Sequence, residues 1–217
     1  QQQQQVERGS SAVRVKPNEA IRMEMQGLVN VKDYAPDIAV QLAYASSRNI
    51  LRTQLYSDFN EAYLQRDAAI KLALAQRIIK SINPDLSLTV HDAARPQRIQ
   101  QRCWELARAR RLQHLFTPPT EISMHTYGVA VDVSLVSRSA HTELDMGALP
   151  DAPGALAAPK RERDMLQSGR LSEQQYANRL LLRRAMQAAG FTTISNEWWH
   201  FEACSRKVAR AKYRPII

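Results

Sequence analysis

The sequence predicts a single α+β domain with a mixed or antiparallel central sheet flanked by helices. Segments with helical and strand periods alternate, but without the regular strand–helix–strand rhythm of a parallel sheet. The 217 residues are 44% hydrophobic, which is enough for one core, and neither an internal repeat nor a linker divides them. No run of 18 apolar residues occurs, which excludes a transmembrane helix.

The N-terminal part of the chain combines a polar leader, short strands and a long helix. Residues 1–20 have almost no apolar periodicity and are expected to be a disordered leader before a domain over residues 21–217. Apolar residues alternate over residues 28–45, which predicts short strands broken at Pro36. Helical spacing then predicts a helix over residues 61–82, which the following Asn-Pro pair ends.

A strand-to-helix junction follows in the middle of the sequence. Residues 86–91 alternate and predict a strand, and Pro96 stands where a helix over residues 97–115 can begin. The junction therefore falls at residues 92–95. A second strand begins at Val129, where valines alternate with other residues and Asp132 leaves the strand on the face opposite to them.

The C-terminal third is predicted to contain a loop, a helix and a strand. Residues 144–160 carry two Pro-Gly clusters and are expected to form a long loop, which in a small domain is often functional. Ser172 and Gln175 have the spacing of a capping box, which starts a helix that ends near Gly190. A strand over residues 191–201 is expected next.

Three residues have the types that a catalytic zinc site needs. Such a site takes three N or O ligands from the protein and leaves a fourth position for water. His125, Asp132 and His200 supply that set, and the expected place for one zinc ion is a cleft on the sheet. Glu197, three residues before His200, can take a proton from the attacking water and pass it to the leaving amine.

Each of these residues also has an ordinary structural interpretation. An isolated histidine is more often a core or surface residue than a ligand, and a pair of tryptophans is more often packed in the core. A carboxylate among valines is harder to explain, because a buried charge needs a partner. Cys204, four residues after His200, is not expected to be a ligand because it would close the open position. The combination favours a site.

The pattern S-x-H-x-x-G-x-A-x-D, followed by E-W-W-H, resembles the zinc-dependent D-alanyl-D-alanine dipeptidases of the VanX type. These belong to a wider group of D-Ala-D-Ala metallopeptidases that act on the cell wall. The resemblance extends from about Val31 to Phe201. It implies zinc ligands at His125, Asp132 and His200, a catalytic base at Glu197, and an arginine over the scissile carbonyl at Arg95.

The resemblance also implies three residues on the substrate side of the site. Asp151 matches a carboxylate that the family places near the substrate amino group, although Pro150 replaces the usual aromatic residue before it. Ser123 and Tyr44 are expected to contact the substrate as well. Ala94 replaces an aromatic residue common in the family, so the pocket wall is expected to be wider here.

The charge balance bears on partners and location. Lys and Arg number 30 against 21 Asp and Glu, giving a net charge of +9. Most of the excess falls on predicted helices and the C-terminal tail, without base-stacking aromatics or a known module, so no nucleic-acid partner is expected. A basic surface suits an exported, periplasmic protein near anionic wall polymers, with a cytoplasmic location as the alternative. The missing initial Met fits either a trimmed chain or a mature exported form, and the oligomeric state stays open.

The predicted function is hydrolysis of a small D,D-dipeptide, D-Ala-D-Ala, in cell-wall precursor or peptidoglycan metabolism. One alternative keeps the fold and the metal but acts on longer peptidoglycan stem peptides, as a carboxypeptidase or endopeptidase. The loop over residues 144–160 decides between them, according to whether it closes the cleft. A second alternative is a non-catalytic, zinc-stabilised wall-binding module, which would need neither Glu197 nor Arg95.

Overall fold

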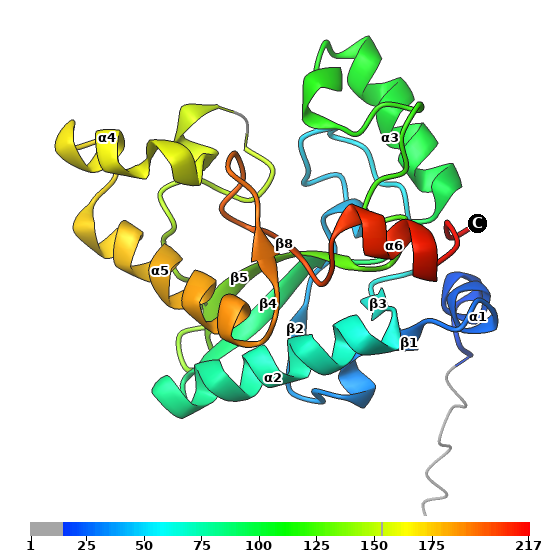
Figure 1. Cartoon of the computed structure of the whole chain (residues 1–217), viewed down its shortest axis with the longest axis horizontal. Helices are drawn as coiled ribbons and strands as arrows, with labels where there is room; N and C mark the ends of the chain where they lie inside the picture. Colours follow the sequence, from blue (N-terminus) through cyan, green and yellow to red (C-terminus); the bar gives the residue numbers. More distant parts are fainter. Residues whose placement is uncertain (1–14, 153) are drawn as a thin grey trace, which may run out of the picture.

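A six-stranded open sheet organises the computed structural model, which describes residues 15–152 and 154–217 (Figure 1). In spatial order the strands are β2 (Ala39–Val40), β4 (Leu86–Asp92), β5 (Ala130–Ser137), β8 (His200–Glu202) and β7 (Thr192–Thr193), with β6 (Thr142–Glu143) paired to the end of β5. β2 is parallel to β4, and the other neighbours are antiparallel. The predicted α+β class with a mixed sheet is confirmed.

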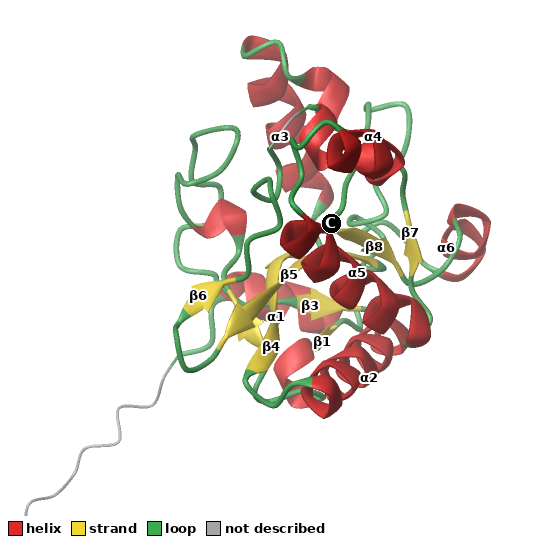
Figure 2. Cartoon of the chain, turned by 90° about the vertical axis from the view of Figure 1, so that its left-hand side faces the viewer, coloured by secondary structure: helices red, strands yellow, loops and turns green. Residues whose placement is uncertain are grey.

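Six α-helices among the described residues surround this sheet. They are α1 (Asn18–Met25), α2 (Arg66–Ile82), α3 (Gln97–Ala109), α4 (Glu162–Gln167), α5 (Glu173–Ala188) and α6 (Arg206–Lys212). Figure 2 shows the strands near the centre of the molecule with α2 and α5 alongside them. None of the described helices has the length and apolarity that a membrane crossing requires.

The core consists of two hydrophobic clusters. The larger one joins α2 and α5 to the sheet, through residues such as Leu72, Ile79, Leu88, Leu135, Leu182 and Met186. Full burial of each such side chain stabilises the fold by roughly 1.5–3 kcal/mol. The smaller cluster joins α1 and α3 through residues such as Tyr44, Tyr56, Phe59, Tyr63, Ile99 and Cys103. Cys103 and Cys204 are free thiols in the structure and do not form a disulfide with each other.

The short strands expected near the N-terminus are present, but two other expectations there differ from the structure. Residues 1–14 of the expected leader lie outside the described residues, but Asn18–Ala20 already belong to α1 and Ala20 is fully buried. The long helix begins at Arg66 rather than at residue 61. The residues before it form β3 (Tyr63–Leu64), which pairs with β1 (Val29–Asn30) because both β3 side chains are buried and the backbone needs partners there.

Two further predicted elements are shorter or divided in the structure. The helix predicted over residues 97–115 ends at Ala109, because Arg111 takes a left-handed conformation (φ 59°), and only a short 3-10 turn follows. The strand predicted over residues 191–201 is wrong as a single element. It is a hairpin of β7 and β8, and the chain reverses at residues 194–199, where Ser195 and Asn196 are typical turn residues.

The predicted strand from Val129, the capping box and the loop over residues 144–160 are confirmed. β5 starts at Ala130 and is buried on both faces over its first six residues. Ser172 and Gln175 exchange both capping hydrogen bonds at the start of α5. The loop contains only two 3-10 turns in its described part.

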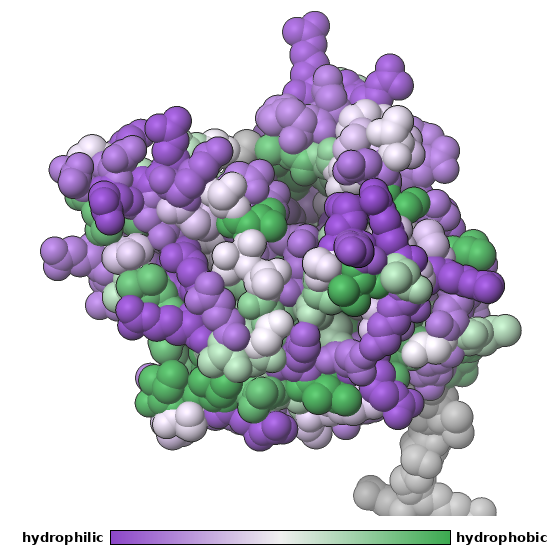
Figure 3. All heavy atoms as spheres, in the orientation of Figure 1, coloured by the Kyte–Doolittle hydropathy of each residue, from purple (hydrophilic) through white to green (hydrophobic). Residues whose placement is uncertain are grey.

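The surface in Figure 3 is mostly hydrophilic, with a hydrophobic band along the lower edge where α2 lies. Ile70, Leu74 and Ile82 of α2 are exposed apolar residues.

Candidate functional site

Three adjacent strands bring Asp92, Asp132 and His200 side by side. Asp132 on β5 pairs directly with Asp92 on β4 and with His200 on β8. Directly opposed residues of antiparallel strands point to the same face of the sheet, so the three side chains gather there. All three are buried.

A β-bulge in β4 decides which residue faces Asp132. Val90 pairs with Val133, and the next pair is Asp92 with Asp132, so His91 is the extra residue. In a regular ladder His91 would oppose Asp132. The bulge instead directs the His91 ring to the carbonyl of Gln41 and the carboxylate of Glu143. Bulges often re-aim side chains beside active sites.

His125 reaches the same group from a tight turn before β5. The turn is closed by hydrogen bonds from Thr126 N to Ser123 O and from Gly128 N to His125 O. Gly128 has φ +75°, and a Cβ there would lie 2.9 Å from Cδ2 of Leu28, so a side chain would strain the backbone and displace Leu28. The His125 carbonyl also accepts a hydrogen bond from Arg95 N, which ties the turn to the start of α3.

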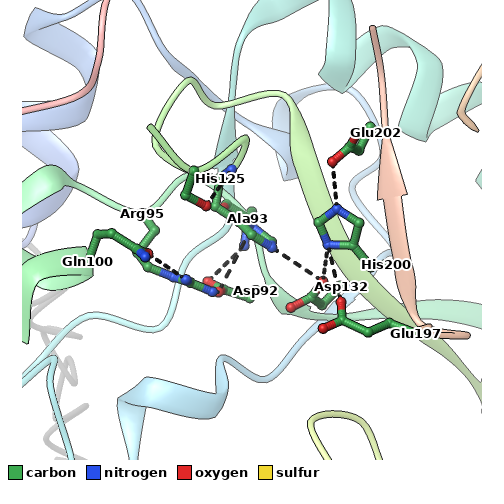
Figure 4. Close-up of polar contacts among 10 residues, drawn as sticks. Asp92, Ala93, Arg95, Gln100, His125, Asp132, Glu197, His200 and Glu202 are labelled. Atoms are coloured by element: carbon green, nitrogen blue, oxygen red, sulfur yellow. Dashed lines mark hydrogen bonds and ion pairs between the residues drawn. The ribbon is translucent and has the colours of Figure 1, made fainter. Parts of the chain in front are cut away.

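His125, Asp132 and His200 form a group that is able to hold a metal ion. Their ligand atoms lie within 4.8 Å of one another. Asp132 Oδ1 is 3.3 Å from Nε2 of His125 and 3.1 Å from Nδ1 of His200 (Figure 4). Two imidazole nitrogens and one carboxylate oxygen are a donor set of catalytic zinc, with a fourth position left open. The residues present therefore fit such an ion.

The charges of this group depend on one another. Burial opposes ionisation of Asp132, but the adjacent His125 and His200 outweigh it and lower the pKa of Asp132. Burial likewise opposes charge on His200, but hydrogen bonds to Asp132 and Glu202 raise the pKa of His200 to about 10. A bound cation would take the place of the proton that His200 holds, because metal ligands must be deprotonated.

Glu197 lies beside this group in the connection between β7 and β8. Its Oε2 is 3.8 Å from Nδ1 of His200, and its side chain is 24% exposed. Burial, with a contribution from Asp132, raises the pKa of Glu197 above its ordinary value, although His200 acts in the opposite direction. The carboxylate is thus close to the candidate ligands and still open to the cleft.

Hydrogen bonds to Asp92 and Gln100 hold the side chain of Arg95 in place. Its Nε and Nη2 donate to Oδ2 of Asp92, and its Nη1 donates to Oε1 of Gln100 at 2.7 Å. Its guanidinium lies 5.3 Å from the ring centroid of Tyr44, a cation–π contact. Burial disfavours the charge, but Asp92 outweighs it and keeps the pKa of Arg95 well above its ordinary value.

A cleft of about 360 Å³ brings all the predicted site residues together. Ser123, Tyr44 and Asp151 line it along with the candidate ligands, Glu197 and Arg95. Asp151 is half-buried and has φ 64°. Burial, followed by the charges of Asp132 and Asp92, raises the pKa of Asp151 to about 7. The cleft lies where the two hydrophobic clusters meet, since Tyr44 belongs to one and Trp199 to the other.

The sequence interpretation missed Asp92, Gln100 and Glu202. Asp92 anchors Arg95, and the available signal was a carboxylate at the end of a buried strand. Gln100 lies one helical turn after Pro96 and its role follows only from α3. Glu202 accepts a hydrogen bond from the ring of His200, and its position two residues later on a strand placed it on the same face.

His91, His114, His141 and Cys204 lie outside the metal-binding group. His114 lines the rim of the cleft. His141 is an exposed turn residue with φ 54°. Cys204 is half-buried beside Lys71 and Lys212, in a separate pocket between α2 and α6.

Two comparisons with known proteins agree with the geometry of this site. Residues 24–214 match the family described as D-ala-D-ala dipeptidase (Peptidase M15), a range that contains the metal-binding group, Glu197 and Arg95. The D-alanyl-D-alanine dipeptidase of Escherichia coli (strain K12) is 34% identical over 176 residues, which cover 81% of this chain and 83% of that protein.

Proposed function

The chain belongs to the D-Ala-D-Ala dipeptidase family, and from this membership we propose that it is a zinc-dependent peptidase that hydrolyses the D-Ala-D-Ala dipeptide. The observation that carries the proposal is the position of Glu197. Its carboxylate lies 3.8 Å from a ring nitrogen of a buried two-histidine, one-aspartate group. A purely structural metal site would need neither the carboxylate of Glu197 nor the nearby Arg95.

The metal would be held by His125, Asp132 and His200. The ring nitrogens nearest to Asp132 are Nε2 of His125 and Nδ1 of His200, and these are the expected ligand atoms. A zinc ion bound there supplies a Lewis acid for the peptide carbonyl and for the attacking water. The burial of all three residues keeps bulk water from competing for the ligand positions.

Glu197 would move the proton. Its carboxylate takes a proton from the attacking water and then delivers it to the amine of the leaving D-alanine. The raised pKa of Glu197 suits both steps, because the group must be a base in the first step and an acid in the second. Its partial exposure to the cleft gives the substrate access to the carboxylate.

Arg95 would stabilise the oxyanion that develops on the scissile carbonyl. Asp92 and Gln100 hold the guanidinium in place before the substrate arrives, so little reorganisation is needed in the transition state. Its raised pKa keeps the guanidinium positively charged.

Asp151 favours a dipeptide over a stem peptide. A carboxylate that lines the cleft can bind the free ammonium of a dipeptide, whereas a stem peptide has an uncharged amide at that point of its chain. Ser123 and Tyr44 line the same cleft and would contact the substrate. The alternative, cleavage of D-Ala-terminated stem peptides, requires the loop that carries Asp151 to move away.

Three substrates test the proposal. Purified protein loaded with zinc is assayed on D-Ala-D-Ala, on L-Ala-L-Ala and on a stem pentapeptide, before and after treatment with a chelator. We expect hydrolysis of D-Ala-D-Ala alone, its loss on chelation and its recovery with zinc. Equal rates on the pentapeptide would favour the carboxypeptidase alternative. A lack of chelator-sensitive hydrolysis of any D,D-peptide would leave the wall-binding alternative.

We also propose that the enzyme works outside the cytoplasm on products of cell-wall metabolism. The net charge of +9 supports this, because anionic wall polymers attract a basic protein through weak, salt-sensitive interactions. Fractionation of cells that produce the full-length protein tests this location, and recovery only with cytoplasmic markers would contradict it.

A further inference from the structure

The imidazole of His200 has a carboxylate at each end. Its Nδ1 faces Asp132 Oδ1 at 3.1 Å and Glu197 Oε2 at 3.8 Å, on the side of the metal-binding group. Its Nε2 faces Oε2 of Glu202 at 2.9 Å, on the opposite side of the ring (Figure 4). Glu202 is therefore outside the metal-binding group, but in contact with one of its members.

We propose that Glu202 is a positioning residue that fixes His200 in the tautomer whose Nδ1 binds the metal. An ionised carboxylate only accepts hydrogen bonds, so the ring nitrogen that faces it must carry the proton. Nδ1 faces Asp132 in the same way, and a bound metal would take the place of the proton on Nδ1, while Glu202 keeps the proton on Nε2. The inference rests on the proposed zinc-dependent function, which assigns His200 as a ligand.

The ring of His125 is also oriented by a hydrogen-bond acceptor, but through its other nitrogen, Nδ1. Nδ1 of His125 lies 2.8 Å from the carbonyl oxygen of Ala93, which also only accepts hydrogen bonds. Nε2 of His125 is then free to bind a metal, and this is the nitrogen nearest to Asp132. The two histidines thus present different nitrogens to one point, and each is oriented by an acceptor behind it.

The sheet holds Glu202 in this position. Glu202 follows His200 by two residues on β8, which places both side chains on one face. Its backbone pairs with Ala130 of β5 on one side and with Thr192 of β7 on the other. Among the described residues, the ion pair of Glu202 within 4 Å is with His200, while nearby Arg206 donates to the carbonyl of Ile122.

A carboxylate behind a metal-binding histidine also makes the imidazole a stronger ligand. Loss of such an outer partner typically weakens metal affinity by roughly 10–100-fold. We therefore expect Glu202→Ala to bind zinc about 10–100-fold more weakly than the wild type. Glu202→Gln should lie between the two, because its amide oxygen still accepts a hydrogen bond but no longer carries a charge.

The main experiment is a zinc titration of the metal-free protein in competition with a chromophoric chelator. Glu143→Gln is a matched control, because Glu143 forms the same kind of hydrogen bond to Nε2 of His91, away from the metal-binding group. The control is expected to keep wild-type zinc affinity. Wild-type affinity in both Glu202 variants would overturn the proposal.

A second measurement needs no variant. Nitrogen-15 NMR of the zinc-loaded wild type is expected to show His200 with zinc on Nδ1 and a proton on Nε2, and zinc on Nε2 would overturn the proposal. Both readouts are independent of substrate. If the Glu202 variants lose zinc affinity but the wild type hydrolyses no D,D-peptide, the proposed function fails and the role of Glu202 stands.

Discussion

His200 and Asp132 face each other directly across β8 and β5, with Nδ1 of His200 3.1 Å from Oδ1 of Asp132. On the neighbouring strand β4, the residue opposite Asp132 is Asp92, which accepts hydrogen bonds from Arg95. One row of paired residues therefore connects the candidate metal ligands to the candidate oxyanion group. Substitutions at the metal-ligand end of this row and at its Arg95 end therefore test metal binding and transition-state stabilisation separately.

Glu197→Gln is expected to lower kcat for D-Ala-D-Ala by roughly 10²–10⁴-fold, because the amide cannot accept the proton of the attacking water. Zinc should remain bound, since Glu197 lies outside the group of three ligands. Steady-state kinetics and the zinc content of the purified variant check both expectations. Wild-type turnover in this variant would exclude Glu197 as the base.

Arg95→Lys is expected to lower kcat by roughly 10²–10³-fold with little change in zinc content, because the flexible ammonium cannot keep the two-sided hydrogen bonding to Asp92 and Gln100. Arg98→Lys, in the first turn of α3 and paired with Glu19 at the surface, is the matched control and should keep wild-type kinetics. An equal effect of the two changes would indicate a general effect of replacing arginine by lysine rather than a specific role of Arg95.

Arg179→Met is expected to destabilise the fold by roughly 3–5 kcal/mol, because it breaks a buried ion pair. The side chain is fully buried, donates to the carbonyls of Met146 and Leu156, and pairs with Glu162. These two carbonyls flank the loop that carries Asp151, so KM should rise more than kcat falls.

Urea denaturation and steady-state kinetics measure the two effects of Arg179→Met. Arg183→Met, which removes a more exposed partner of Glu162, should cost less than Arg179→Met. If the two variants were equally stable, Arg179 would have no special role in holding the loop.

The pair of His91 and Glu143 should make stability depend on pH. Burial lowers the pKa of His91, but the hydrogen bond and charge of Glu143 outweigh it, and the pKa is raised above 6.5. A raised folded-state pKa stabilises the fold below the pKa of the unfolded state, and this contribution is lost as the pH rises through the folded-state value. Glu143→Gln should therefore be less stable than the wild type at about pH 5.5, and equally stable at about pH 9.

Urea denaturation at the two pH values checks this expectation. The difference at low pH should stay below about 1 kcal/mol, because the Glu143 side chain is 38% exposed and water screens the pair. A difference that grows with pH would contradict the assignment.

Local patterns in the sequence determined the fold class and the identity of the candidate ligands. The alternation from Val129 predicts β5, and the spacing of Ser172 and Gln175 predicts the start of α5, because both depend on neighbouring residues alone. The types of His125, Asp132 and His200 indicate a metal site for a chemical reason, since imidazole and carboxylate are zinc ligands.

The tertiary structure decided which other residues act with these ligands. The bulge that places Asp92 rather than His91 opposite Asp132 depends on the register between β4 and β5, which are separated by the whole of α3. The reversal that puts Glu197 in a hairpin connection depends on β7 pairing with β8. The contact of Glu202 with Nε2 of His200 depends on the orientation of a ring that Asp132 holds from another strand. Register and ring orientation arise from contacts between distant segments, so periodicity along one segment does not contain them.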